Sequence, residues 1–201
     1  MRSPPVIPAL MFGPLKANFI ASGMGVLLVP PGGMNVDRIT GSLEPYGIAE
    51  EEMDRLLRIF VDESVEGEGP HTVPMDPGDI EGSIRIWSDE KRKLMEATGR
   101  PVLKIVYIDA LSDHFPPDQT RRMMEREIAS TKKEGGLLLM FHRPGSEGLR
   151  QYASNLSDID LRLLNEQGII LFHGAYPRTL LYAMETIESG GHQEIKLTPM
   201  I

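Results

Sequence analysis

Two polar residues close apolar runs in the sequence. Asp109 ends PVLKIVYID (101–109), and His142 ends LLLMFH (137–142). If these runs are parallel strands, both residues lie at the carboxyl ends of the strands, where such sheets bind their ligands. An acid there can hold a magnesium ion directly or through water, and a histidine can sense a phosphate or a catalytic water. The alternative is structural: Asp109 caps its loop with Asx hydrogen bonds, and His142 ends its strand with a satisfied hydrogen bond.

Two glycine-containing segments are candidates for binding a phosphate. The loop pattern G-x-x-x-x-G-K-[ST] is absent from the sequence. FGPLKANF supplies Gly13 and Lys16, but Ala17 stands where a hydroxyl is needed. PPGGMNVD supplies Gly32 and Gly33 without a following lysine or serine. The backbone N–H groups of either segment can still cradle an anion, although the residues establish no cofactor.

Other catalytic arrangements are missing from the sequence. The chain has no cysteine, which excludes disulfides, thiolate nucleophiles and cysteine zinc sites. No G-x-S-x-G elbow is present. Histidines in the spacing of metal ligands are also missing, since the five stand far apart, at positions 71, 114, 142, 173 and 192.

Length and charge bound the classes of protein. The 201 residues of this 22.4 kDa chain suit one domain, and a net charge of −8 argues against a general binder of nucleic acid or anionic membranes. No apolar run approaches the ~18–20 residues of a membrane helix. The proline-broken start MRSPPVIPALMFGP is interpreted as a strand and not as a signal peptide, which predicts a cytoplasmic protein. A local basic stripe remains open, formed by Arg121, Arg122, Arg143 and Arg150; the alternative is that the first two pair with Glu125 and Glu127.

Strand and helix patterns alternate through residue 155 and predict an α/β fold, a mainly parallel sheet with helices on both faces. The segment 63–79, rich in glycine, proline and acids, is expected to be the longest loop. On one predicted helix, Trp87 shares a buried face with Ile80, Ile84 and Leu94. The strands are expected near 25–30, 57–62, 102–109 and 137–142, and the helices near 36–46, 48–56, 79–97, 117–134 and 146–155.

The pattern changes after residue 155. Four apolar segments follow with little room for helices between them, which predicts a meander of hairpins that extends one edge of the sheet. These segments are 159–164, 168–174, 180–188 and 194–201. Apolar runs at a sheet edge need covering or pairing, as does the apolar surface expected near residues 6–12. We therefore expect a homo-oligomer, most simply a two-fold dimer, unless the N-terminal strand folds back and seals the edge.

In their order along the chain, these segments resemble the RecA-like ATPase domain of the KaiC-type family, including its archaeal single-domain paralogues. GVLLVP resembles the second strand of that family, PVLKIVYIDALSDHF its Walker B strand with Asp109 as the metal-side acid, and GGLLLMFHRPG the following strand. Residues 156–201 resemble a variant hairpin tail in relatives of the gas-vesicle regulatory branch. The resemblance covers roughly residues 20–201 and implies one three-layer RecA-like domain over residues 1–201, whose phosphate-loop region (1–24) is degenerate or truncated.

The sequence departs from this family where hydrolysis occurs. The phosphate loop should precede about residue 14, and the water-activating glutamates after the second strand are replaced by Pro30, Pro31, Gly32 and Gly33. Losing one such element typically costs ~10²–10³ in rate. The resemblance therefore implies a non-catalytic pseudo-ATPase, a regulatory or binding subunit that pairs with itself or with a paralogous RecA-like subunit. Two alternatives stay open: an ATP-binding or weakly hydrolysing protein with an atypical phosphate loop, and a DNA-associated accessory protein.

Overall fold

A five-stranded parallel sheet forms the centre of the computed structural model, which describes residues 6–31, 34–62, 69–76, 78–142, 147–167, 169–189 and 192–200. The strand order is β3-β2-β1-β4-β5. Strands β2 and β3 are added on one side of β1 and strands β4 and β5 on the other, so the strand order reverses between β1 and β4. All four neighbouring pairs are parallel. The strands are β1 (Val26–Val29), β2 (Leu57–Asp62), β3 (Thr72–Met75), β4 (Leu103–Tyr107) and β5 (Leu137–Phe141).

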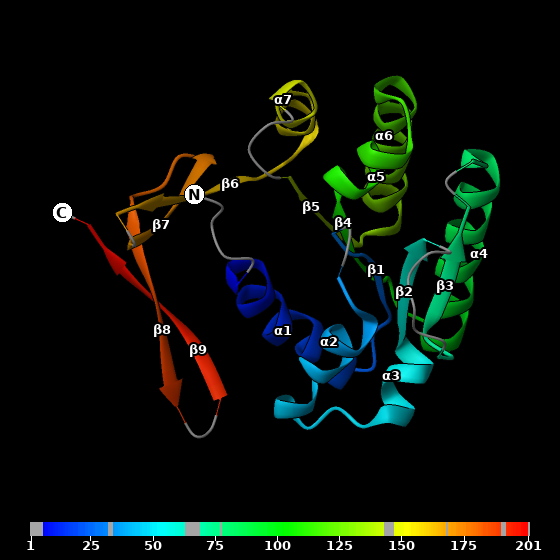
Figure 1. Ribbon diagram of the computed structural model, residues 1–201, viewed down its shortest axis with the longest axis horizontal. Coiled ribbons are helices and arrows are strands. Elements are labelled where there is room, and N and C mark those ends of the chain that lie inside the picture. The colour runs from blue at the N-terminus through cyan, green and yellow to red at the C-terminus, as the bar shows by residue number, and fades with distance from the viewer. Residues whose placement is uncertain are drawn as a thin grey trace.

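Helices cover both faces of this sheet, as Figure 1 shows. One face carries α1 (Val6–Ala21), α2 (Val36–Gly41), the 3₁₀ turn η1 (Glu44–Tyr46) and α3 (Glu50–Leu56). The other carries α4 (Ile80–Thr98), α6 (Pro117–Glu134) and α7 (Glu147–Leu156), with the short α5 (Ile108–His114) before α6. Two covered faces explain why every residue of β1 and β4 is buried. The predicted α/β fold is therefore confirmed.

Local sequence signals set the ends of the long helices. Asp79 caps α4, because its Oδ1 accepts a hydrogen bond from the Gly82 N–H at 2.8 Å. Gly99 (φ 64°) and Gly135 (φ 68°) follow α4 and α6 in the left-handed conformation that glycine adopts without a Cβ clash. The apolar face of α4 points inward as predicted, with Trp87 buried against Phe60 at 4.7 Å between ring centroids.

Three predicted boundaries in the parallel half are wrong. Residues 6–21 form the helix α1 and not a strand. Pro8 falls in its first turn, where a missing N–H is tolerated, whereas Pro14 lies inside the helix at the cost of one hydrogen bond. Ala17 and Ile20 pack into the core at helical spacing. The predicted loop 63–79 contains β3, an edge strand in which Pro74 is allowed. The strand predicted to reach Asp109 ends at Tyr107, and α5 begins at the next residue, Ile108.

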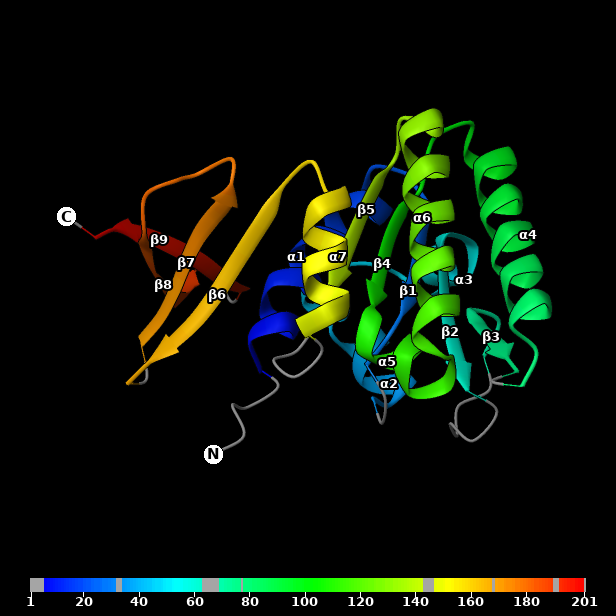
Figure 2. The same cartoon turned by 90° about the horizontal axis from the view of Figure 1, so that it is seen from above.

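The four C-terminal strands form a sheet of their own. Its order is β6-β7-β8-β9 and all pairs are antiparallel, which confirms the meander. Among the described residues, this sheet is not hydrogen-bonded to the parallel one, so the predicted extension of an edge is wrong. Figures 1 and 2 place it beside the body, beyond α1 and α7. The strands are β6 (Asp160–Glu166), β7 (Ile169–Tyr176), β8 (Tyr182–Ser189) and β9 (His192–Pro199).

Candidate functional site

Asp109 and His142 follow neighbouring strands. Asp109 lies in the first turn of α5, two residues after β4, and His142 comes directly after β5. The register pairs Tyr107 with Phe141, whose rings lie 5.2 Å apart, so both polar residues are at the carboxyl end of the sheet. In the part of the chain that the structure describes, no group of three histidine, aspartate or glutamate residues could hold a metal ion. The roles proposed for Asp109 and His142 in metal or phosphate binding stay predictions.

His142 lies at the junction with the second sheet. Its Nδ1 is buried and has no hydrogen-bond partner among the described residues. Burial alone would raise the pKa of Asp160, the first residue of β6. Hydrogen bonds from Ser154 (2.6 Å) and Arg162 (3.3 Å), together with the charges of Arg162 and His142, outweigh burial and lower that pKa. The electrostatic effect of His142 therefore falls on the start of the second sheet.

The predicted loop around Gly13 and Lys16 is wrong, because both residues lie inside α1. Lys16 is buried and its Nζ donates to Ser42 Oγ at 3.3 Å. Burial lowers the pKa of Lys16 to about 8. The nucleotide-binding role of Gly13 and Lys16 stays a prediction. The other two predicted phosphate-binding residues, Gly32 and Gly33, lie outside the described residues.

The predicted pairing of two arginines with glutamates is also wrong. Arg121 contacts Asp118 at 3.7 Å and stacks over the Tyr152 ring at 5.5 Å from its centroid. Glu127 pairs with Lys104 of β4, and Glu125 accepts a hydrogen bond from the Tyr152 hydroxyl. One member of the predicted basic stripe, Arg143, lies outside the described residues. A nucleic-acid role stays a prediction.

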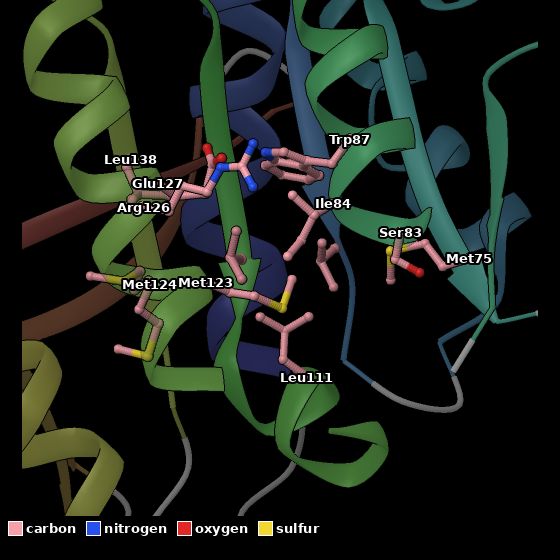
Figure 3. Close-up of a pocket in the computed structure, with 13 residues that line it drawn as sticks. Met75, Ser83, Ile84, Trp87, Leu111, Met123, Met124, Arg126, Glu127 and Leu138 are labelled. Carbon is pink, nitrogen blue, oxygen red and sulfur yellow. The ribbon is translucent and has the colours of Figure 1, made fainter. Parts of the chain in front are cut away.

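Sequence reasoning missed an apolar cavity between α4 and α6, drawn in Figure 3. Its volume is ≈ 40 Å³. Because α4 packs on β3 and α6 on β5, the two helices leave a gap over β1 and β4. Aliphatic and aromatic side chains line it together with four methionines, Met75, Met123, Met124 and Met140. Met75 and Met140 fall at the carboxyl-terminal ends of their strands, which is the one signal in the sequence that points to this place.

The cavity lies over the face of the parallel sheet that α4 and α6 cover (Figure 1). Val29 of β1 and Val106 of β4 form its floor, near the carboxyl ends of the two strands between which the strand order reverses. Ligands of doubly wound sheets bind in the crevice just outside such strand ends, and this cavity is next to that place. Its apolar lining and this neighbourhood make the cavity the candidate binding site of the parallel half.

A charge cluster joins the same two helices toward the amino end of the sheet and shares Glu127 with the cavity. Lys104 of β4 is fully buried, donates to Thr131 Oγ1 at 2.9 Å and pairs with Glu127 and Glu134, each at 3.2 Å. Lys91 of α4 pairs with Glu134 at 2.8 Å. Burial alone would raise the pKa of Glu134, but the hydrogen bonds from Lys91 and Ser130 and the charge of Lys104 lower it to about 2. The helices are thus tied at one end of the sheet and separated at the other.

One face of the second sheet carries a regular set of large apolar side chains, and the opposite face mixes apolar side chains such as Leu164 and Ile169 with charged ones. The strand register places two large apolar side chains from each strand on the same side of the sheet. Leu161, Leu163 and Leu197 are exposed there and the other members are half-buried, and α1 is the main body element that approaches the sheet. We call this surface the apolar face; it consists of Leu161, Leu163, Ile170, Phe172, Tyr182, Met184, Ile195 and Leu197.

Comparisons with known proteins find solved structures that resemble this chain. No protein-family model and no curated protein matches the sequence. An uncharacterized protein from Pyrococcus horikoshii, crystallised in complex with an unknown peptide, is similar in structure, with a TM-score of 0.61 at 16% sequence identity. The similarity covers 93% of this chain and 85% of that one. At this identity it shows a shared α/β fold. Within the described residues, none of the helices has the length and apolar character needed to cross a membrane.

Proposed function

We propose that this chain is a non-catalytic binding subunit that self-associates through the apolar face of β6–β9. The observation that carries the proposal is that face, because an apolar side of a sheet must be buried against another layer and this chain supplies little cover. The face presents two large apolar side chains from each of the four strands, and β7 and β8 join over three residue pairs. Contiguous apolar patches on a monomer are often functional.

A two-fold dimer is the simplest assembly that buries the apolar face. Two identical sheets related by a two-fold axis pack face to face as in a β-sandwich, each copy supplying the cover that the other lacks. A paralogous subunit with a similar tail offers the same surface. The Pyrococcus horikoshii protein was crystallised in complex with an unknown peptide, which supports a binding role for this fold.

Within this proposal the chain is a cytoplasmic RecA- and KaiC-like pseudo-ATPase. The enclosure of Lys16 in α1 supports it, because the only lysine near the expected phosphate loop is turned toward Ser42. The competing function is ATP and magnesium binding, favoured by the place of Asp109 just beyond an interior strand. A ligand at 100 times its Kd stabilises a protein by about 2.7 kcal/mol. Millimolar ATP with magnesium should leave the melting temperature unchanged, whereas a clear rise favours the competing function.

Light scattering at micromolar concentration tests the assembly, and it should give twice the 22.4 kDa of one chain. The chain offers a matched pair of variants, because Leu163 (38% exposed) lies on the apolar face and its neighbour Leu164 (44% exposed) on the opposite face of β6. Leu163→Glu should yield a 22.4 kDa monomer and Leu164→Glu should remain a dimer. A natural chain that scatters as a monomer, or two variants that behave alike, would overturn the proposal.

A further inference from the structure

Two hydrogen-bond donors reach the cavity between α4 and α6 without an acceptor. Trp87 is only 6% exposed, and its Nε1 has no hydrogen-bond partner among the described residues. Arg126 of α6 is exposed, lines the same cavity and forms no hydrogen bond or ion pair with another described residue. Figure 3 shows its side chain extending toward the Trp87 indole. A buried donor without a partner costs ~1–3 kcal/mol, so an acceptor that fills this place is favoured.

The other polar groups of the cavity are already engaged. Ser83 Oγ donates to the Asp76 carbonyl at 3.1 Å, and the carboxylate of Glu127 accepts from Lys104 at 3.2 Å. Apart from Arg126 and Glu127, the walls of the cavity around Trp87 are apolar. An acceptor with negative charge, attached to something apolar, satisfies both donors and the walls.

The volume of the cavity limits what that apolar part is. At ≈ 40 Å³ the cavity exceeds the ~10–15 Å³ that one water requires and falls far below the ~300 Å³ at which small-molecule sites begin. Because a cavity of ~150 Å³ is what takes up a benzene ring, this one has room for the end of a single apolar side chain. Single apolar side chains that enter such pockets are the usual anchors of protein recognition. Methionine walls adapt to anchors of different shape because their side chains are unbranched and flexible.

We propose that this cavity binds a peptide segment that inserts one large apolar side chain and places a carboxylate beside it. The carboxylate accepts hydrogen bonds from Trp87 Nε1 and from the guanidinium of Arg126. An acidic side chain next to the anchor and the carboxylate of a C-terminal anchor residue supply the same chemistry. The site lies on the parallel half of the molecule, so it does not depend on self-association through the apolar face.

The chain contains its own reporter for this binding, because Trp87 is its single tryptophan. Short synthetic peptides without tryptophan, each with one Leu, Met or Phe beside one Glu, should change the emission of Trp87 in a saturable way. The same anchors with a free C-terminus and no Glu distinguish the two sources of the carboxylate. Amidated peptides in which Gln replaces Glu should bind at least about tenfold more weakly, since the charge-assisted hydrogen bonds are lost.

Matched variants show whether the peptide occupies this cavity. Arg126→Gln should weaken binding about tenfold, whereas Arg122→Gln, an exposed arginine one turn away that does not line the cavity, should leave it unchanged. Trp87→Phe keeps an aromatic ring against Phe60 and removes only the N–H donor, so calorimetry on this variant should also show weaker binding. Leu163→Glu, made to prevent self-association, should bind the peptides like the natural chain.

Several outcomes would overturn the proposal. One is that no peptide changes the emission at millimolar concentration. Another is that Arg126→Gln and Arg122→Gln lower the affinity equally, which would place the peptide elsewhere. A third is that dodecanoate, and none of the peptides, binds saturably with the same dependence on Arg126, which would make the site one for small apolar acids.

Discussion

The two sheets of this molecule use similar residues and leave them in opposite surroundings. Leu27 and Leu103, in β1 and β4, are 0% exposed because helices cover both faces of the parallel sheet. In the antiparallel sheet, Leu161 and Leu197 are 55% and 43% exposed. Burial of an aliphatic side chain stabilises a folded protein by roughly 1.5–3 kcal/mol. The parallel sheet gains this stabilisation within one chain, whereas the exposed side chains of the antiparallel sheet gain only part of it. This difference is the physical reason to expect a partner at β6–β9.

The largest expected effect tests this comparison directly. Leu27→Ala should destabilise the protein by about 2–5 kcal/mol, because it opens a cavity in a covered sheet. Leu197→Ala removes the same atoms from an exposed position and should cost less than about 1 kcal/mol in dilute protein. Urea unfolding measures both. If the apolar face is buried in a dimer, the cost of Leu197→Ala should grow with protein concentration; equal costs for both variants in dilute protein would contradict the comparison.

The sequence predicts the covered sheet better than its surroundings. Strands β1, β2, β4 and β5 are continuous apolar runs bounded by glycine, proline or charge, and such runs show themselves in any sequence. The helix α1 was not predicted because its segment contains prolines, and the free-energy cost of a proline depends on its position in the helix. Strand β3 was hidden because four residues with one proline resemble a loop. The local sequence pattern therefore predicts a helix or strand correctly only where tertiary packing favours the same conformation.

The candidate binding site is harder to predict from the sequence than the fold. The cavity joins residues of β1, β3, β4, β5 and three helices, and its existence depends on the spacing between α4 and α6, which no local pattern records. The alternation in the tail predicted hairpins correctly. Whether they extend the first sheet or form a second one depends on α7, which packs beside α6 and leads the chain away from β5.

A smaller effect contrasts two lysines, one in the parallel half of the molecule and one in the antiparallel sheet. Lys16 is buried on the α1 side of the parallel sheet, and Lys196 is exposed on β9. The folded pKa of Lys16, about 8, is below the ~10.4 of an unfolded lysine, so its charge opposes folding at neutral pH. Lys16→Met should therefore stabilise the protein by about 1–3 kcal/mol below pH 8.

That stabilisation has a defined pH dependence. The natural chain gains stability as pH rises from about 8 to ~10.4, because folded Lys16 has then lost the proton that the unfolded chain still holds. The advantage of Lys16→Met should vanish across this range. Thermal melts at pH 7 and near pH 10 measure the difference. A variant as stable as the natural chain at pH 7 would show that Lys16 is not buried as described.

The smallest effect separates two acids whose pKa values are lowered on the two sides of the molecule. Glu134 lies in the charge cluster that ties α6 to α4, and Asp160 begins β6. A carboxylate with a lowered pKa stabilises the fold above its unfolded pKa, and this contribution is lost as pH falls toward the folded value. For Glu134 the loss should therefore run from about pH 4.3 down to about 2. Glu134→Gln should cost about 1 kcal/mol at pH 7, because contact with solvent screens the pairs, and the difference should disappear near pH 2.

Asp160→Asn should weaken only the junction with the second sheet, so hydrogen exchange should increase in β6 and leave β4 unchanged. Equal exchange in both strands would mean that the two sheets unfold as one unit, and that the contrast between them lies in exposure alone.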